Sequence, residues 1–292
     1  MVVATAVGVA LALLLTLPLA WKWQLGVRRV ALVVALLGLG SGLALAPLEL
    51  APIVQSMLVC GLALVAASGI LAYRFYRDPE RTAPAAGDGA VVSPADGEVV
   101  YVRRSREGML PMSTKHGRDY ALQELTRTPL RSREAVVIGI AMSFLDVHVN
   151  RAPIAGTVTV QRHFPGLFGS LRRPEMVFVN ERATTVIESG SHQVAVVQIA
   201  SRLVRQIAAF VREGDTVAVG QRIGVIRLGS QVDVVLPADS GLDVSVELGD
   251  RVRAGESVLA RLPQEAPGSA NRSDASSAAG PTTRQPLSAG TT

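Results

Sequence analysis

The stretches Glu213–Gln221 (EGDTVAVGQ) and Leu248–Glu256 (LGDRVRAGE) share the pattern G-D-x-V-x-x-G-[QE]. Glycine and aspartate favour tight turns, and valine favours an extended backbone. Each copy therefore predicts a turn, a short strand and a second turn. The two copies together form a weak internal repeat near the end of the chain.

Around this repeat, residues 75–262 alternate short β-branched runs with Gly, Pro and Asp, a texture typical of a domain built from short strands. The predicted strands are Val91-Val92, Val99–Val102, Ala135–Met142, Thr157–Val160, Val194–Ile199, Thr216–Val219 and Val232–Leu236. Helices are predicted at Asp119–Thr126 and Arg202–Phe210. Because turn–strand–turn repeats occur in the barrel-sandwich folds of biotinyl and lipoyl carriers, we expect a mainly β (α+β), barrel-sandwich-like domain with a few helices.

The excess of apolar residues lies at the N-terminus, in the segments Val2–Trp21, Val30–Ala46 and Ala51–Tyr73. Each is close to the ~20 residues that a helix needs to cross a bilayer. We expect residues 1–74 to form a membrane anchor of two or three transmembrane helices. A hairpin of the latter two segments, with the first lying peripherally, remains an alternative. A signal peptide is a weaker interpretation, because the first positive charge follows the apolar run.

Basic residues flank the first and third apolar segments on one side. They are Lys22, Arg28, Arg29, Arg74, Arg77 and Arg81. The positive-inside rule therefore predicts a cell-membrane protein whose domain lies on the cytoplasmic face. The net charge of +5 fits anionic lipid, whereas 4% aromatic residues disfavour a nucleic-acid surface. Residues 264–292, rich in Ser, Ala, Gly, Pro and Thr, predict a disordered tail.

Gly229-Ser230 is a candidate reactive peptide bond. A serine hydroxyl can attack the carbonyl of a preceding glycine, because glycine has no Cβ to block the approach. The resulting ester can eliminate to dehydroalanine, which hydrolyses to a pyruvoyl group. Gly-Ser also occurs at residues 40–41, 169–170, 190–191 and 268–269, so the dipeptide alone is more typical of a turn.

A second candidate is the segment around His148. If the chain is extended there, Asp146, His148 and Asn150 project from one face, and Asp146 can fix the tautomer of a His148 acid/base. A solvated edge strand explains the same alternation. Asp96, in the turn Ser93–Gly97, can orient a histidine or accept a serine proton, although an Asp-Gly pair is also common turn chemistry.

Six blocks in order connect these candidates. They are Tyr73–Arg81 (YRFYRDPER), Val92–Val99 (VSPADGEV), Phe144–Gly156 (FLDVHVNRAPIAG), Asn180–Arg182 (NER), Val197–Ser201 (VQIAS) and Arg227–Pro237 (RLGSQVDVVLP). Together they resemble the short bacterial and archaeal phosphatidylserine decarboxylases over about residues 74–262. The resemblance implies a self-processing, pyruvoyl-dependent carboxy-lyase with a domain at 75–263. Such an enzyme converts phosphatidylserine to phosphatidylethanolamine and carbon dioxide through a Schiff base.

The resemblance also implies the site. Cleavage between Gly229 and Ser230 is expected to leave an associated β chain 1–229 and α chain 230–292, with a pyruvoyl group made from Ser230 and no metal. Asp96 corresponds to the carboxylate of the family's autocleavage triad.

Longer members carry D-x-H-x-x-H, and here Arg151 replaces the second histidine. We therefore expect His148 to serve both cleavage and decarboxylation, with Asp146 as its partner. Arg151 and Asn150 are expected to bind the phospholipid substrate. The expected partners are the membrane and the two chains of one proenzyme but no nucleic acid, and a homo-oligomer stays open.

Two further alternatives stand beside this interpretation. A non-catalytic, membrane-anchored barrel-sandwich adaptor, like membrane-fusion subunits, explains the anchor and the repeat, but leaves the polar residues around His148 unexplained. A decarboxylase for another serine phospholipid, such as an ether lipid, shares the head group, so the sequence does not separate it. A lipoyl or biotinyl carrier is disfavoured, since neither Lys22 nor Lys115 lies in the repeats.

Overall fold

The computed structural model describes residues 1–263 except 24, 86–88, 112–118, 133, 172, 174, 202–206, 227–230 and 239–240. The predicted tail 264–292 lies outside the described residues. The helices are α1 (Val2–Lys22), α2 (Val27–Leu45), the 3-10 turn η1 (Ala46–Leu48), α3 (Pro52–Tyr76), α4 (Leu122–Thr126) and α5 (Met176–Val179). The strands are β1 (Ala90–Val92), β2 (Gly97–Arg104), β3 (Met109–Pro111), β4 (Asp119–Ala121), β5 (Ala135–Ala141), β6 (Val149–Arg151), β7 (Gly156–Phe164), β8 (Arg182–Ser189), β9 (His192–Ile199), β10 (Ile207–Ala209), β11 (Thr216–Val217), β12 (Arg222–Ile226), β13 (Gln231–Pro237), β14 (Asp243–Val244), β15 (Arg251–Val252) and β16 (Val258–Arg261).

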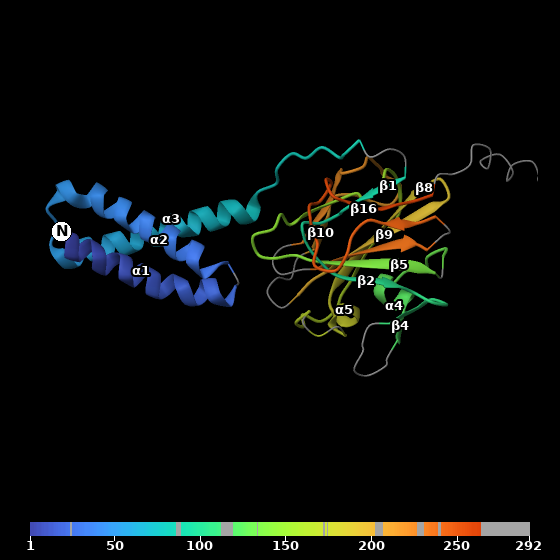
Figure 1. Ribbon diagram of the computed structural model, residues 1–292, viewed down its shortest axis with the longest axis horizontal. Helices are drawn as coiled ribbons and strands as arrows, with labels where there is room; N and C mark the ends of the chain where they lie inside the picture. The colour runs from blue at the N-terminus through green and yellow to red at the C-terminus, as the bar shows by residue number, and fades with distance from the viewer. Residues whose placement is uncertain are drawn as a thin grey trace, which may run out of the picture.

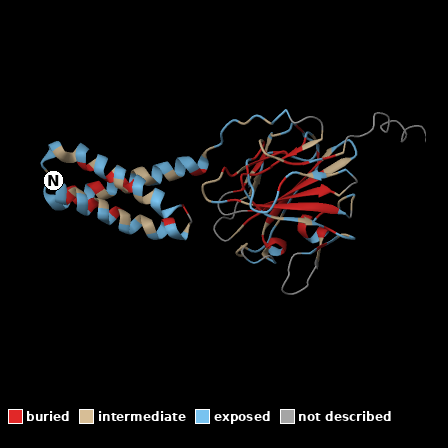
Figure 2. Cartoon of the chain, viewed as in Figure 1, coloured by how far each residue is buried: buried red, intermediate tan, exposed pale blue. Residues whose placement is uncertain are grey.

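The helices α1, α2 and α3 pack side by side and project from a strand-rich domain (Figure 1). All three are long and apolar enough to cross a membrane, by length and composition. Most of their large apolar side chains face outward, as Figure 2 shows by the exposed colour along the bundle. An outward apolar surface suits lipid, because lipid tails do not penalise it as water does.

Small residues line the contacts between these helices. Ala4, Gly8 and Ala12 of α1 are buried, as are Gly38 and Gly42 of α2. Each set repeats every four residues, so its members lie on one face of a helix and let two backbones approach closely.

The strand domain is dominated by one sheet of eight strands in the order β11-β7-β8-β9-β13-β5-β2-β15. Its central strand, β13, pairs antiparallel with β9 on one side and β5 on the other, and all seven of its residues are buried. Apolar clusters fill both faces of the sheet, which is why its middle strands are coloured as buried in Figure 2. The structure thus confirms a mainly β domain with few helices behind N-terminal apolar helices.

The internal repeat is structural. Gly214 and Gly249 both have φ +93°, and Gly220 and Gly255 both have φ +74°. These left-handed values are strained for residues with a Cβ, which explains the glycines at both ends of each copy. The two short strands between them, β11 and β15, close opposite edges of the main sheet.

The repeat extends to the whole domain. Each strand in one half of the main sheet has a counterpart in the other half. From the edges inward, β11, β7, β8 and β9 correspond to β15, β2, β5 and β13. The two small sheets match in the same way, β10-β12-β6 against β14-β16-β1. One unit runs continuously from β6 to β12, whereas its counterpart consists of β1, β2 and β5 followed, after that insertion, by β13 to β16.

Two sequence predictions need correction. The predicted helix Asp119–Thr126 is a strand, β4, over Asp119–Ala121 and a helix only from Leu122. Of the predicted helix Arg202–Phe210, residues 207–209 form β10 and pair with β12, while 202–206 lie outside the described residues. Both segments are short, so strand pairing overrides their weak helix propensity.

The glycines of α2 give a matched pair for testing the bundle. A Cβ on Gly42 meets Thr5 Cγ2 at 2.3 Å, whereas a Cβ on Gly40 meets nothing within 4 Å. We expect Gly42→Ala to destabilise the bundle by roughly 1–3 kcal/mol through overpacking, and Gly40→Ala to leave it unchanged. Thermal unfolding in detergent, followed by tryptophan fluorescence, measures this, because Trp21 and Trp23 at the end of α1 are the two tryptophans of the chain. Equal midpoints for the two variants contradict the prediction.

Candidate functional site

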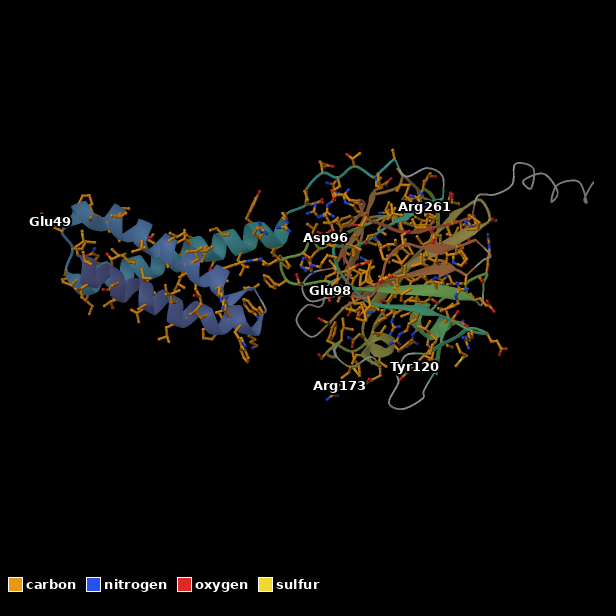
Figure 3. All side chains as sticks on the ribbon, in the orientation of Figure 1. Glu49, Asp96, Glu98, Tyr120, Arg173 and Arg261 are labelled. Carbon is orange, nitrogen blue, oxygen red and sulfur yellow. The ribbon has the colours of Figure 1, made fainter. Side chains whose placement is uncertain are left out.

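Asp96 lies in the turn between β1 and β2, on the side of the domain that faces the helices (Figure 3). The turn is held by its backbone: Gly255 N–H donates to Ser93 O at 2.7 Å, and Arg151 N–H donates to Pro94 O at 2.9 Å. Gly97 closes it, since a Cβ there falls 2.3 Å from Ala141 O of β5.

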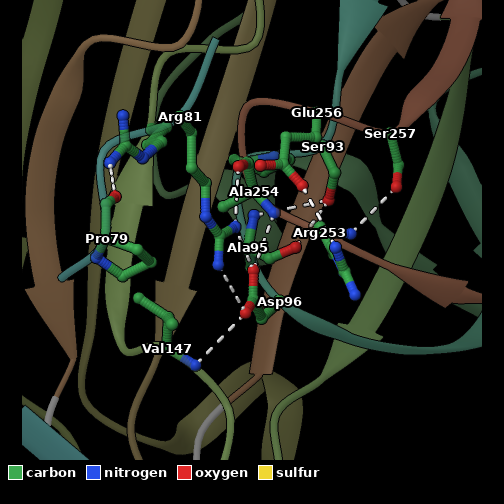
Figure 4. A network of polar contacts seen from close by, with 12 residues as sticks. Pro79, Arg81, Ser93, Ala95, Asp96, Val147, Arg253, Ala254, Glu256 and Ser257 are labelled. Carbon is green, nitrogen blue, oxygen red and sulfur yellow. Dashed lines mark hydrogen bonds and ion pairs between the residues drawn. The ribbon is translucent and has the colours of Figure 1, made fainter. Parts of the chain in front are cut away.

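Four donors surround the Asp96 carboxylate (Figure 4). Arg81 forms a two-pronged ion pair with it, one prong being Nη2 to Oδ2 at 2.8 Å. The backbone N–H groups of Ala254 and Val147 donate to its two oxygens at 2.8 and 3.3 Å. Burial raises the pKa of Asp96, but these donors and the Arg81 charge outweigh it and lower that pKa below its usual value. Asp96 is therefore a buried carboxylate held in its ionised form.

His148 directly precedes β6 in the chain, and it is only 3% exposed. Neither Nδ1 nor Nε2 has a hydrogen-bond partner among the described residues. Burial lowers the pKa of His148, opposed by the backbone and carboxylate of Asp146 and by the charge of Asp96. A neutral imidazole with two unpaired nitrogens can accept or donate a proton, which is the behaviour of a general acid/base.

Helix α3 contacts this histidine directly. The ring of Phe75, in the last turn of α3, lies 4.6 Å from the ring of His148. Phe144 lies 5.2 Å from Phe75 and stacks on Trp23, beyond the end of α1, at 5.5 Å. The ends of α1 and α3 and the His148 segment therefore share one continuous row of aromatic contacts.

Asp146 lies close to His148 but not on a shared strand face. The chain turns at Asp146, whose carboxylate accepts the N–H of Ser143 at 2.7 Å, and β6 begins only at Val149. The condition for one polar face, an extended chain from 146 to 150, is therefore not met. Asp146 instead lies across a turn from His148, where its backbone and then its charge raise the pKa of the imidazole.

Asn150 and Arg151 are buried and bonded within the protein. Asn150 donates to Pro94 O at 3.3 Å and accepts from Gln198 Nε2 at 2.8 Å. Arg151 donates to Gly220 O and Pro79 O, both at 2.9 Å, while its buried Nε has no partner among the described residues. Their role in binding a substrate stays a prediction, and their contacts here support the walls of the site.

Ser230 and Gly229 lie outside the described residues, together with 227 and 228. The described residues that flank this segment, Ile226 and Gln231, are hydrogen-bonded into the domain. Ile226 N–H donates to the backbone carbonyl of His148 at 3.1 Å, and Gln231 opens β13 opposite Ile199 and Ala141. Ile226, three residues before Gly229 in the sequence, is therefore a hydrogen-bonded neighbour of His148.

A second polar cluster joins β13 to β2, and it was not predicted from the sequence. Tyr101 donates to Asp233 at 2.5 Å, and Gln231 Nε2 contacts Asp233 at 2.7 Å and the Tyr101 hydroxyl oxygen at 2.8 Å. Gly139 leaves room for the Tyr101 ring, since a Cβ there falls 2.5 Å from it. Burial raises the pKa of Asp233 to about 6, against the pull of Tyr101, Gln231 and Arg182.

Arg81 was also missed as a site residue, although it lies in a quoted block. The sequence feature that could have indicated it is an arginine two residues after Pro79, in a stretch of alternating charge. Asp233 could have been noticed as an acidic residue inside the apolar run Val232–Leu236. Among the described residues, no group of three His, Cys, Asp or Glu side chains is placed to hold a metal ion.

The described residues thus bring together an ionised buried carboxylate, Asp96, and a buried histidine, His148, whose ring nitrogens have no partner among them. The family model described as phosphatidylserine decarboxylase matches residues 69–260. The chain belongs to this family. The phosphatidylserine decarboxylases are carboxy-lyases, so the predicted family and enzyme class are confirmed, and the adaptor alternative is not favoured.

Individual relatives agree with this family assignment. A protein of Symbiobacterium thermophilum named phosphatidylserine decarboxylase proenzyme is 40% identical over 69% of this chain and 84% of its own length. One of Mycolicibacterium gilvum with the same name is 44% identical over 65% and 73%. A putative archaetidylserine decarboxylase proenzyme of Methanocaldococcus jannaschii is 40% identical over 64% and 87%.

The raised pKa of Asp233 predicts that the free energy of unfolding depends on pH. Folded protein keeps a proton on Asp233 up to about pH 6, whereas the unfolded chain releases it near 3.8, so this group lowers stability as pH rises through that window. We expect Asp233→Asn, in an uncut Ser230→Ala background, to gain stability relative to its parent between pH 4 and 6.5, by up to roughly 3 kcal/mol.

Thermal midpoints of the two proteins across this pH range measure the difference. Asp243→Asn, at an exposed aspartate of β14, is the control and is expected to show a constant difference. A constant difference for Asp233→Asn as well contradicts the prediction.

Proposed function

We propose that the chain decarboxylates phosphatidylserine, using a pyruvoyl group that it makes from Ser230 by cutting the bond to Gly229. The single observation that carries the proposal is His148: buried, with both ring nitrogens unpaired among the described residues, and bonded through its carbonyl to Ile226 at the edge of the Gly-Ser segment. The names of the relatives supply the substrate and the proenzyme state.

The described residues fit a pyruvoyl group. Such a group needs a proton donor and acceptor beside it, and His148 has two buried nitrogens without partners. It also needs a fixed attachment point, and Gln231 is hydrogen-bonded into the middle of the main sheet. When formed, the group supplies an electron sink for the bond that loses carbon dioxide.

Self-cleavage begins with proton removal. His148 takes the proton of the Ser230 hydroxyl, and the oxygen attacks the carbonyl carbon of Gly229, so that the acyl group moves from nitrogen to oxygen. The charge of Asp96 stabilises the protonated His148, since the two are neighbours without a direct hydrogen bond among the described residues. Loss of the Cα proton of residue 230 then breaks its Cβ–O bond and frees the Gly229 carboxylate. Water adds to the resulting enamine in its imine form and displaces the nitrogen as ammonia.

In decarboxylation, the residues of this chain position the substrate and move one proton. His148 returns a proton to the carbon that has lost carbon dioxide. Phe75 packs against the imidazole, and Phe144 packs behind Phe75, an apolar setting that is consistent with the lowered pKa of His148. Arg151 is bonded to Asp78, Pro79 and Gly220 and supports the wall of the site.

The arrangement also supports a cytoplasmic site at a membrane surface. The exposed basic residues Lys22, Arg28, Arg29 and Arg74 all lie at the domain-side ends of the helices, whereas Glu49 lies at the opposite end (Figure 3). The positive-inside rule assigns the basic end to the cytoplasm. His148 then lies beside the lipid headgroups, where a phospholipid presents its amine and carboxylate.

Intact mass spectrometry of the purified protein tests the cut. Cleavage before Ser230 predicts an α chain of 292 − 230 + 1 = 63 residues whose first residue carries a ketone in place of its amine. Ser230→Ala is expected to stay whole. Ser170→Ala, at another Gly-Ser pair, is the matched control and is expected to be cut normally. One uncut chain in the wild type refutes the pyruvoyl mechanism.

The role of His148 predicts a shift in pH dependence. The carboxylate of Asp146 raises the pKa of His148, so Asp146→Asn lowers it while keeping an acceptor for Ser143 N–H. Neutral His148 is the active base, so the acid limb of the cleavage rate is expected to move to lower pH. A pulse of cell-free synthesis into nanodiscs, chased at pH 5–8 and read on gels, gives the rate. A limb that stays or moves upward contradicts this role.

A further inference from the structure

The segment Arg77–Arg81, here called the strap, continues α3 along the surface of the strand domain. Arg77 donates to Leu145 O at 3.0 Å, at the start of the strap. Asp78, the next residue of the strap, forms ion pairs with Arg151 (Nη2 to Oδ1, 3.3 Å) and with Arg222 (Nε to Oδ2, 2.5 Å). The strap is thus fixed to the domain at each step.

The strap ends at Arg81, which is the most buried of its ion-pairing side chains, at 6% exposure. Besides its two-pronged pair with Asp96, Arg81 Nη1 donates to Ala254 O at 2.8 Å. Ala254 in turn donates its own N–H to Asp96 (Figure 4). Arg81, Asp96 and Ala254 therefore form a closed ring of contacts.

We propose that Arg81 is a positioning residue of the site, holding the Asp96 carboxylate ionised and aimed beside His148. The inference rests on the proposed function, in which Asp96 assists His148. A planar guanidinium matches a carboxylate with two parallel bonds, which a lysine ammonium does not reproduce. Asp96 acts on His148 through its charge, so the group that preserves that charge sets how well His148 works.

The charged neighbours of this pair come from three elements. They are Arg77, Asp78 and Arg81 of the strap, Asp146 and His148 of the segment before β6, and Glu256 after β15. Of these, Arg81 is the partner that holds Asp96 directly. Without Arg81 the pKa of Asp96 rises, because the two backbone N–H groups then oppose the effect of burial without the hydrogen bonds and charge of the guanidinium.

Two changes then follow for self-cleavage. Where Asp96 takes up a proton, its charge no longer stabilises the protonated His148 formed in the reaction, and the cleavage rate falls. Where Asp96 stays ionised, the carboxylate without its arginine raises the pKa of His148 further, and more of the base is protonated. This second effect moves the acid limb of the cleavage rate to higher pH.

The test uses the full chain in nanodiscs, pulse-labelled by cell-free synthesis and chased between pH 5 and 9. Arg81→Gln is expected to slow cleavage at least about tenfold at pH 7, the scale of a lost charge-assisted hydrogen bond, and to move the acid limb upward. Arg81→Lys keeps the charge but not the fork, and is expected to lie between the wild type and Arg81→Gln in both measures.

Arg222→Gln is the matched control. Arg222 pairs with Asp78 and Glu80 of the same strap but does not touch Asp96, so its loss loosens the strap and leaves the carboxylate paired. We expect an unchanged acid limb for this variant. If Arg81→Gln behaves like Arg222→Gln, or if Arg81→Lys and Arg81→Gln both keep the wild-type profile, the positioning role is wrong. A wild-type chain that stays uncut refutes the proposed function itself.

Discussion

The double pairing of β13 is the constraint on which the rest of the domain depends. This strand is buried along its whole length and hydrogen-bonded to β5 and β9 at once. Its first residue, Gln231, follows Ser230, the serine that we propose is converted to a pyruvoyl group. Cutting before such a strand frees one end without releasing the strand, because its ladder and its apolar contacts do not involve the cut bond. The two products are therefore expected to remain one folded body.

Burial governs the electrostatics of the site in the same way. Asp96 and His148 are both withdrawn from water, which on its own pushes each toward neutrality. Asp96 remains a carboxylate because Arg81 and two N–H groups reach it, whereas the imidazole of His148 has no such partner among the described residues. One buried group is thus held charged and its neighbour neutral, the pairing that proton transfer between a serine and a histidine requires.

Much of this was readable from the sequence, because its patterns are local. The apolar N-terminal segments, the β-branched runs and the turn repeat predicted helices, strands and a mainly β domain. The blocks around Asp96, His148 and Ser230 predicted the family. Long-range contacts were not readable: nothing local connects Arg81 to Asp96, or Tyr101 to Asp233, which is 132 positions away. The helix predicted at Arg202–Phe210 failed for the same reason, since its end is recruited as a strand by β12.

The twofold internal repeat has a consequence for how the site arose. Pro94 and Gly97 of one unit correspond to Pro153 and Gly156 of the other, and both glycines have φ near +156°. The position of Asp96 is held in the second unit by Ala155, which is exposed. Since an alanine suffices to build that turn, the carboxylate is not a requirement of the architecture. The domain thus offers two equivalent loops, of which one carries a plain alanine and the other an ionised carboxylate held by Arg81 and two backbone N–H groups.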